Sequence, residues 1–253
     1  MLGGCATLPN GHRWGEDATY RPGWDRVRHS ALEAVRDPWV WVPAIGAGVL
    51  QMGDADREIS DWAREHTPVF GSQRSAERWS DDLRSASWVA YHASVLATPS
   101  GDDAGRWIGS KAKGYLVGFA AAGLTGFATE QLKASTDRER PSGVDHESMP
   151  SGHTSASAVF TQLASRNLRS IEIDDPARCT LDIGLDVLTI GTAWARIEAG
   201  AHFPSDTLIS IALGNFIASF VNDAFLGLED DSQVALAVVA TGDGAALRFQ
   251  RRF

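Results

Sequence analysis

Three stretches of the chain, at residues 38–53, 114–129 and 207–222, contain no charged residue and are rich in apolar and small side chains. Apolar residues fall on all sides of them, which is typical of helices buried in the middle of a domain. Each is shorter than the ~18 apolar residues that a membrane span requires. The sequence therefore predicts a bundle built around buried core helices, with no transmembrane span.

The residues around these stretches complete a mainly α pattern. We expect helices at residues 25–36, 39–52, 54–65, 75–97, 103–134, 151–168, 181–199 and 204–225. Residues 1–24 form an irregular lead segment with several Gly and Pro, and residues 25–228 form one helical domain. In the tail, at 229–253, two β-prone segments flank Thr241-Gly242-Asp243-Gly244, which predicts a β-hairpin.

Composition excludes some classes of partner. The net charge of −9 argues against nucleic acid and gives no polybasic patch for a membrane surface. The chain has nine tryptophans, a high count. Several of them, including Trp39, Trp62, Trp79 and Trp88, fall in helical stretches, and we expect them to pack in the core rather than to stack on a ligand.

The second half of the chain carries three polar signatures in order. They are Lys133-x6-Arg140-Pro141, then Pro150-Ser151-Gly152-His153, then Arg196-x5-His202-x3-Asp206. Together they supply three cations, two imidazoles and one carboxylate. This set suits an enzyme that holds a phosphoryl group by its oxygens and attacks its phosphorus with a histidine.

The phosphate-binding groups come from all three signatures. Cations aimed at the phosphoryl oxygens stabilise the charge that spreads over them during transfer, and Lys133, Arg140 and Arg196 supply three. Ser151 is the expected N-cap of a helix whose first backbone N–H groups point at an anion. Gly152 lets that anion approach the backbone closely.

The histidines supply the chemistry. His153, in the first turn of the helix, is placed to protonate the leaving oxygen. Asp206 lies four residues after His202, so we expect its carboxylate to reach one ring nitrogen and to leave the other nitrogen free for attack. Asp206 should raise the pKa of His202 while the cations lower the pKa of both imidazoles, which predicts a bell-shaped pH profile with an optimum at roughly pH 5–7.

The signatures resemble those of the type-2 phosphatidic acid phosphatase superfamily, which also contains bacterial acid phosphatases and vanadate-dependent haloperoxidases. The resemblance implies the helical bundle of that superfamily, with His202 as nucleophile, Asp206 as its orienting group, and His153 as acid and then base. It also implies a phosphohistidine intermediate with no metal or other cofactor. Ala195 departs from the pattern, because a serine usually precedes the arginine of the third signature; this puts fine tuning of the site in doubt.

Two other functions remain open. One is a vanadate-dependent haloperoxidase, since a site that holds phosphate also holds vanadate; the short interval at residues 142–149 favours a phosphatase instead. The other is a catalytically silent envelope protein that keeps the fold. The leading prediction is a phosphatase for phosphate monoesters, either lipid phosphates or small organic phosphates.

The N-terminal residues bear on localisation. Leu2-Gly3-Gly4-Cys5 resembles the end of a bacterial lipoprotein signal, although no basic and apolar segment precedes it. We expect a lipidated Cys5 that attaches a periplasmic or outer-membrane-associated protein to the membrane, with an inert surface cysteine as the alternative.

Overall fold

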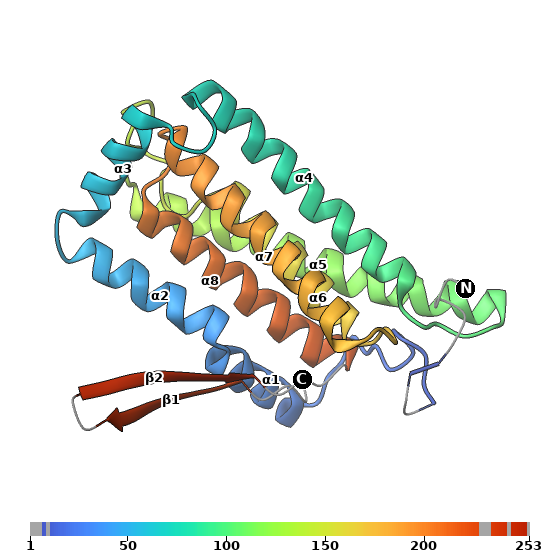
Figure 1. Ribbon diagram of the computed structural model, residues 1–253. Coiled ribbons are helices and arrows are strands. Elements are labelled where there is room, and N and C mark those ends of the chain that lie inside the picture. The colour runs from blue at the N-terminus through green and yellow to red at the C-terminus, as the bar shows by residue number, and fades with distance from the viewer. Residues whose placement is uncertain (1–6, 9–10, 228–233, 242–243, 252–253) are drawn as a thin grey trace.

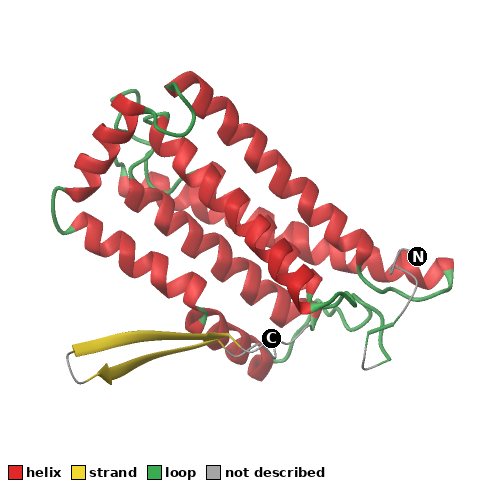
Figure 2. Cartoon of the chain, viewed as in Figure 1, coloured by secondary structure: helices red, strands yellow, loops and turns green. Residues whose placement is uncertain are grey.

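The computed structural model describes residues 7–8, 11–227, 234–241 and 244–251, and within them the chain is mainly helical (Figures 1 and 2). Its helices are α1 (Trp24–Arg36), α2 (Pro38–Gln51), α3 (Ala55–His66), α4 (Gln73–Ala97), α5 (Ala104–Thr136), α6 (Gly152–Leu168), α7 (Asp175–Glu198) and α8 (Pro204–Val221). The π-helix η2 (Asn222–Leu226) continues α8. After the bundle, β1 (Val234–Thr241) pairs antiparallel with β2 (Gly244–Arg251).

The helices begin where local sequence signals place them, and the expected mainly α class is confirmed. The Ser151 side chain accepts from Thr154 N at the start of α6, and the Asp103 side chain does the same for Arg106 N at the start of α5. Such caps satisfy backbone donors that have no partner within the helix. One start was wrong: α7 begins at Asp175 rather than at residue 181, because Asp174 caps it and a proline occupies its first turn.

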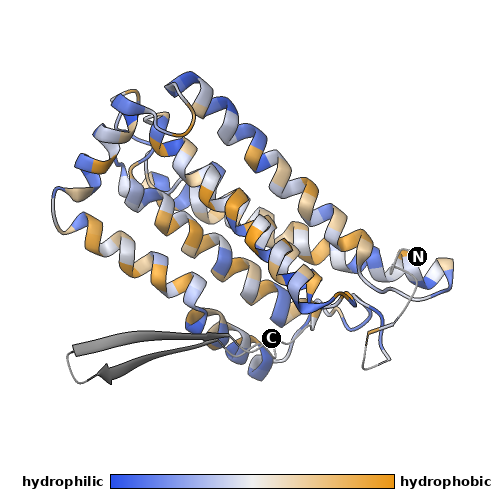
Figure 3. Cartoon of the chain, viewed as in Figure 1, coloured by the Kyte–Doolittle hydropathy of each residue, from blue (hydrophilic) through white to orange (hydrophobic). Residues whose placement is uncertain are grey.

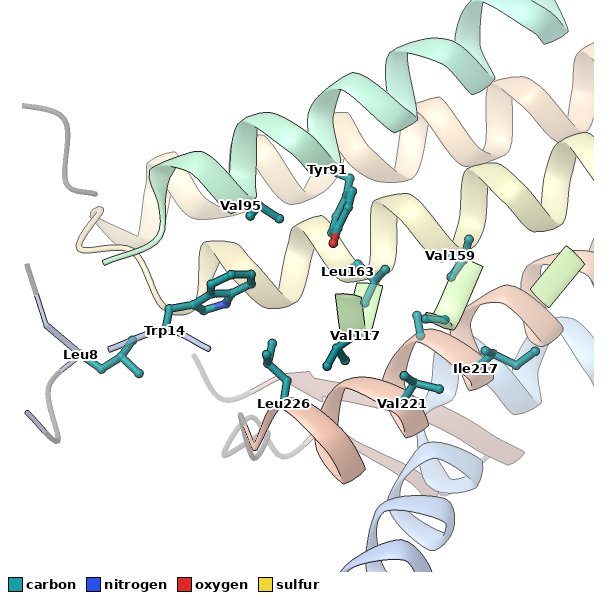
Figure 4. Close-up of a cluster of buried hydrophobic side chains, with 12 residues drawn as sticks. Leu8, Trp14, Tyr91, Val95, Val117, Val159, Leu163, Ile217, Val221 and Leu226 are labelled. Carbon is teal, nitrogen blue, oxygen red and sulfur yellow. The ribbon is translucent and has the colours of Figure 1, made fainter. Parts of the chain in front are cut away.

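The centre of the bundle is the pair α6 and α8, with α2, α4, α5 and α7 packed around it (Figure 1). The buried core contains Val159 and Leu163 from α6 and Ile217 from α8 (Figure 4). Tyr91 of α4 reaches α5 at Gly118, where an added Cβ would lie 1.8 Å from the tyrosine hydroxyl. The missing side chain of Gly118 therefore lets the large ring pack between the helices.

The outer faces of the helices carry many large apolar side chains. Trp39, Trp62, Trp79 and Trp88 are 38–49% exposed. The expectation that these tryptophans pack in the core is therefore wrong: the helical period was right, but their rings lie on the outside of the bundle. Figure 3 shows apolar residues along α2 and α7 as well, and Val49 and Val187 are among those that are exposed.

The last helical segment also departs from expectation. From Pro204 to Leu226 it is 23 residues long, with a mean hydropathy of 1.5 over its most apolar part, so it is long and apolar enough to cross a membrane. About two thirds of that part, 67%, is buried inside the bundle. The sequence-based prediction that no segment could span a membrane is wrong, because it required an unbroken uncharged run and this helix continues past the charged residues that flank the run.

Candidate active site

The three signatures meet at the end of the bundle that also carries α3 (Figure 1). Lys133 lies near the end of α5, Arg196 near the end of α7, and Arg140 in the loop that joins α5 to α6. His153 lies in the first turn of α6, and His202 in the short turn before α8. Antiparallel packing of the helices therefore brings together residues that are far apart in the sequence.

Lys133, Arg140 and Arg196 form a cationic cradle. Lys133 Nζ lies 3.6 Å and Arg140 Nη2 3.9 Å from the same oxygen, Glu147 Oε2. Arg196 is only 5% exposed and donates to Ser80 Oγ at 3.3 Å. Its Nε is buried and has no hydrogen-bond partner in the described part of the chain. A buried guanidinium with a donor to spare is suited to an anion.

The start of α6 faces this cradle. Ser151 is fully buried and donates its backbone N–H to Ser210 Oγ at 2.7 Å, which fixes the N-cap against α8. A Cβ added at Gly152 would lie 3.9 Å from Lys133 Nζ, so the glycine backbone lies beside the lysine ammonium. The positive end of the helix dipole thus adds to the charge of the cradle.

His202 is buried, at 2% exposure, and the hydrogen bond of its ring goes to a backbone carbonyl. Nδ1 donates to Ser148 O at 2.5 Å, which leaves Nε2 as the nitrogen with a lone pair. Burial lowers the pKa of His202 well below its usual value, and repulsion from Arg196, Arg140 and Lys133 lowers this pKa further. The imidazole is therefore neutral near pH 7, the form that a nucleophile requires.

Asp206 takes a different place from the one that its spacing predicts. Its Oδ2 accepts from Ser148 Oγ at 2.6 Å and from Phe203 N at 2.8 Å, and its Oδ1 accepts from Arg138 Nη1 at 2.5 Å. No hydrogen bond joins Asp206 to His202 among the described residues, so the predicted direct contact is wrong. The expected lowering of the pKa of His202 by Lys133, Arg140 and Arg196 is confirmed, whereas the group that raises this pKa is the Ser148 carbonyl and not Asp206. Asp206 acts on the ring through Ser148.

His153 has a partner that the signatures do not contain. Its Nε2 donates to Asp81 Oδ1 at 2.8 Å, from α4. Burial lowers the pKa of His153 and repulsion from Arg196 adds to this effect, while the hydrogen bond to Asp81 opposes both. The two imidazoles therefore lie in different surroundings: His202 is buried against a carbonyl, and His153 is half-buried against a carboxylate.

Comparison with known proteins agrees with this geometry. The family model that matches the chain is described as the PAP2 superfamily, and the match covers residues 114–227. The match spans 114 of the 253 residues. The matched residues include every signature residue of the site, from Lys133 to Asp206. A search of curated proteins gives no match.

A solved structure is similar in fold. It is the crystal structure of a transmembrane PAP2-type phosphatidylglycerolphosphate phosphatase from Bacillus subtilis, with a TM-score of 0.54 and 18% sequence identity. The similarity covers 77% of this chain and 94% of the other. At this level of identity the match establishes the helical fold that PAP2 proteins share and leaves substrate and mechanism to other arguments.

The comparison corrects the predicted localisation. A PAP2 protein of the same fold is transmembrane, and this chain has a helix long and apolar enough to span a membrane. Both findings contradict the prediction of a protein without a transmembrane span that is held in the periplasm or at the outer membrane. Cys5, on which the lipoprotein prediction rested, lies outside the described residues.

Two other features of the described residues help to define the site. A cavity of about 760 Å³ lies between α1, α2, α6, α7 and α8, is lined by charges of both signs, and includes no signature residue. Within the same residues no cluster of three or more His, Cys, Asp or Glu side chains could hold a metal ion. Apart from Asp81 beside His153, the charged groups that act on the two imidazoles are mainly cations, and together with the helix-start amides they suit an anion.

Proposed function

We propose that this PAP2 protein is a phosphatase that hydrolyses phosphate monoesters through a phosphohistidine at His202. The observation that carries the proposal is the placement of His202: Nδ1 is occupied by Ser148 O, and the charges of Lys133, Arg140 and Arg196 all act on its ring. A neutral imidazole beside three cations is poised to attack phosphorus while the cations hold the phosphoryl oxygens.

The reaction proceeds in two halves. First, His202 Nε2 attacks phosphorus, the bond to the leaving oxygen breaks, and His153 donates its proton to that oxygen. In the second half, His153 takes a proton from water, the water oxygen attacks phosphorus, and the P–N bond breaks to release phosphate. Lys133, Arg140 and Arg196 neutralise the charge for which many phosphoryl-transfer enzymes use a divalent cation, so the mechanism needs no metal.

The second part of the proposal is that the bundle lies in a lipid bilayer and acts on lipid phosphates. The outer helix faces expose apolar side chains that a water-exposed bundle would bury. They include Ile45 and Val49 on α2, Val89 and Leu96 on α4, Leu116, Phe119 and Phe127 on α5, and Ile183, Val187 and Ile190 on α7. Helices α4, α5 and α7 have 25, 33 and 24 residues, so they are long enough to reach across a bilayer. Among the described residues, only Pro204–Leu226 is also apolar enough to span one by composition.

The interior of the bundle supports the same proposal. Hydroxyl pairs join neighbouring helices, among them Ser87 with Ser157 at 2.6 Å and Thr161 with Thr189 at 2.7 Å. Small residues and hydroxyl hydrogen bonds between helices are typical of bundles in membranes, where apolar contact alone does not hold helices together. The site lies at one end of the bundle, where a lipid headgroup meets water. The similar solved structure is of a phosphatase for a phospholipid.

Phosphoryl trapping tests the mechanism. Protein purified in detergent is mixed with a labelled phosphate monoester and quenched with base. The wild type should retain label that is stable in base and released by acid, and His202→Asn should retain none. His66→Ala is the matched control, because His66 is exposed on α3 and, in the described part of the chain, its ring hydrogen bond goes to Trp62 O of the same helix. Turnover that EDTA abolishes and Mg²⁺ or Zn²⁺ restores would refute the mechanism.

Membrane extraction and a substrate pair test the second part. After an alkaline carbonate wash the protein should remain in the membrane fraction, and release into the supernatant would contradict its embedding. Phosphatidate in mixed micelles should give a higher kcat/KM than glycerol phosphate, since only the lipid is concentrated at the bundle surface. Equal values would favour a phosphatase for small soluble phosphates. Halide oxidation with added vanadate and peroxide would favour the haloperoxidase alternative.

A further inference from the structure

A buried carboxylate on α3 touches the start of α8. Asp56 is 4% exposed and accepts from Ser205 N at 2.8 Å and from Ser205 Oγ at 2.6 Å. It also accepts from Arg138 Nη2 at 2.7 Å. A carboxylate taken out of water is costly unless several donors compensate it, so three donors on one aspartate mark a built arrangement rather than a chance surface contact.

Arg138 connects this carboxylate to the site. Although Arg138 lies between Lys133 and Arg140 in the sequence, its guanidinium bonds to residues outside the cradle. Nη1 donates to Asp206 Oδ1 at 2.5 Å and to Ser205 Oγ at 2.8 Å. Its plane lies over the Phe203 ring, 4.2 Å from the centroid. One guanidinium thus holds two carboxylates and the turn that follows His202.

The connection continues to the ring of His202 through Ser148. Asp206 Oδ2 accepts from Ser148 Oγ at 2.6 Å, and Ser148 N donates to Arg138 O at 2.9 Å. Ser148 is fully buried, and its carbonyl accepts from His202 Nδ1 at 2.5 Å. The position of that carbonyl therefore depends on Arg138 through its backbone and on Asp206 through its side chain.

We infer that Asp56 and Arg138 are positioning residues for the reaction: they hold Ser148 so that its carbonyl fixes the tautomer of His202 and aims Nε2 at phosphorus. The inference rests on the proposed role of His202 as nucleophile. It assigns the two residues no contact with substrate, because the phosphate-binding groups are Lys133, Arg140 and Arg196. Loss of either should therefore slow the chemical step without weakening anion binding.

The test uses Asp56→Asn, Arg138→Gln and the double variant. In each, kcat should fall about 10–100-fold, the loss expected when a reacting group is displaced by a fraction of an ångström. KM and the inhibition constant of inorganic phosphate should change less than about 3-fold, because the cradle is intact. Asp61→Asn is the matched control: this aspartate is on the same helix, half-exposed, and pairs with Arg64 at 3.6 Å.

Stability separates positioning from a merely structural role. Arg138→Gln leaves two buried carboxylates, Asp56 and Asp206, without their shared cation. The double variant leaves only Asp206 in that state, so its thermal midpoint should lie above that of Arg138→Gln. Its kcat should stay low. A kcat that recovers with the midpoint, or an inhibition constant that rises in step with the loss of kcat, would overturn the inference. His202→Asn is assayed in parallel: if it still turns over, the proposed function fails instead.

Discussion

Gly214 lies where α8 crosses α6, and replacing it with alanine should push the two central helices apart. A Cβ built at this position would lie 2.7 Å from Ala158 Cβ, 2.7 Å from Ser155 O and 2.9 Å from Val159 N. Two of these three atoms are backbone atoms of a helix, so they cannot turn aside as a long side chain would. Relief of the contacts requires movement of a whole helix.

The magnitude follows from two opposing effects. Overpacking of a closely packed core costs about 1–3 kcal/mol, and contacts against backbone belong at the upper end of this range. Alanine has a helix propensity about 1 kcal/mol better than that of glycine. The free energy of unfolding should therefore fall by about 2 kcal/mol, which is a decrease in Tm of roughly 4–8 °C for a domain of this size.

The matched control is Gly126→Ala on α5, where nothing lies within 4 Å of the added Cβ. This variant gains the helix propensity without the clash, so its Tm should stay the same or rise. Both are measured by thermal unfolding in one detergent, followed by circular dichroism. Because α6 carries His153 and α8 follows His202 directly, Gly214→Ala should also lower kcat. Equal Tm values for the two variants would refute the packing argument.

Three further predictions concern the site. The Glu147 carboxylate lies within 4 Å of both Lys133 and Arg140, where it competes with the substrate phosphate for these cations. Initial rates of Glu147→Gln should therefore show a KM about 2–5-fold lower and an unchanged kcat, since exposed ion pairs contribute at most about 1 kcal/mol. An unchanged KM would show that Glu147 does not compete with the substrate. Asp81→Asn removes the carboxylate charge that helps to raise the pKa of His153. The basic limb of kcat/KM, where the acid loses its proton, should therefore move to lower pH, and a limb that stays in place would exclude His153 as that acid. Because the pKa of His202 is lowered, its neutral form persists on acidification, and the acid limb of kcat/KM should lie below pH ~6.5; an acid limb above that value would mean that another group must lose its proton.

Much of the fold could be predicted because its determinants are local. The helical period, the caps at Asp103 and Ser151, and the proline that opens α8 each act within one turn, and the helices begin close to where these residues place them. The signatures were visible for a similar reason, since each lies within a short segment. Their meeting at one end could also be predicted, because consecutive helices of a bundle run antiparallel.

The sequence by itself determined the helices, the cationic cradle and the two histidines of this protein, since residue type and short spacing specify them. Only the tertiary structure decided how the histidines are held. Spacing favoured Asp206 as the partner of His202, yet the loop before α6 brings the Ser148 carbonyl to the ring instead. Asp81 and Asp56 reach the site from α4 and α3, which contain no signature residue. The tertiary structure also decided which helix faces point outward. Periodicity in the sequence shows that a helix has an apolar face, but it does not show whether protein or lipid covers that face.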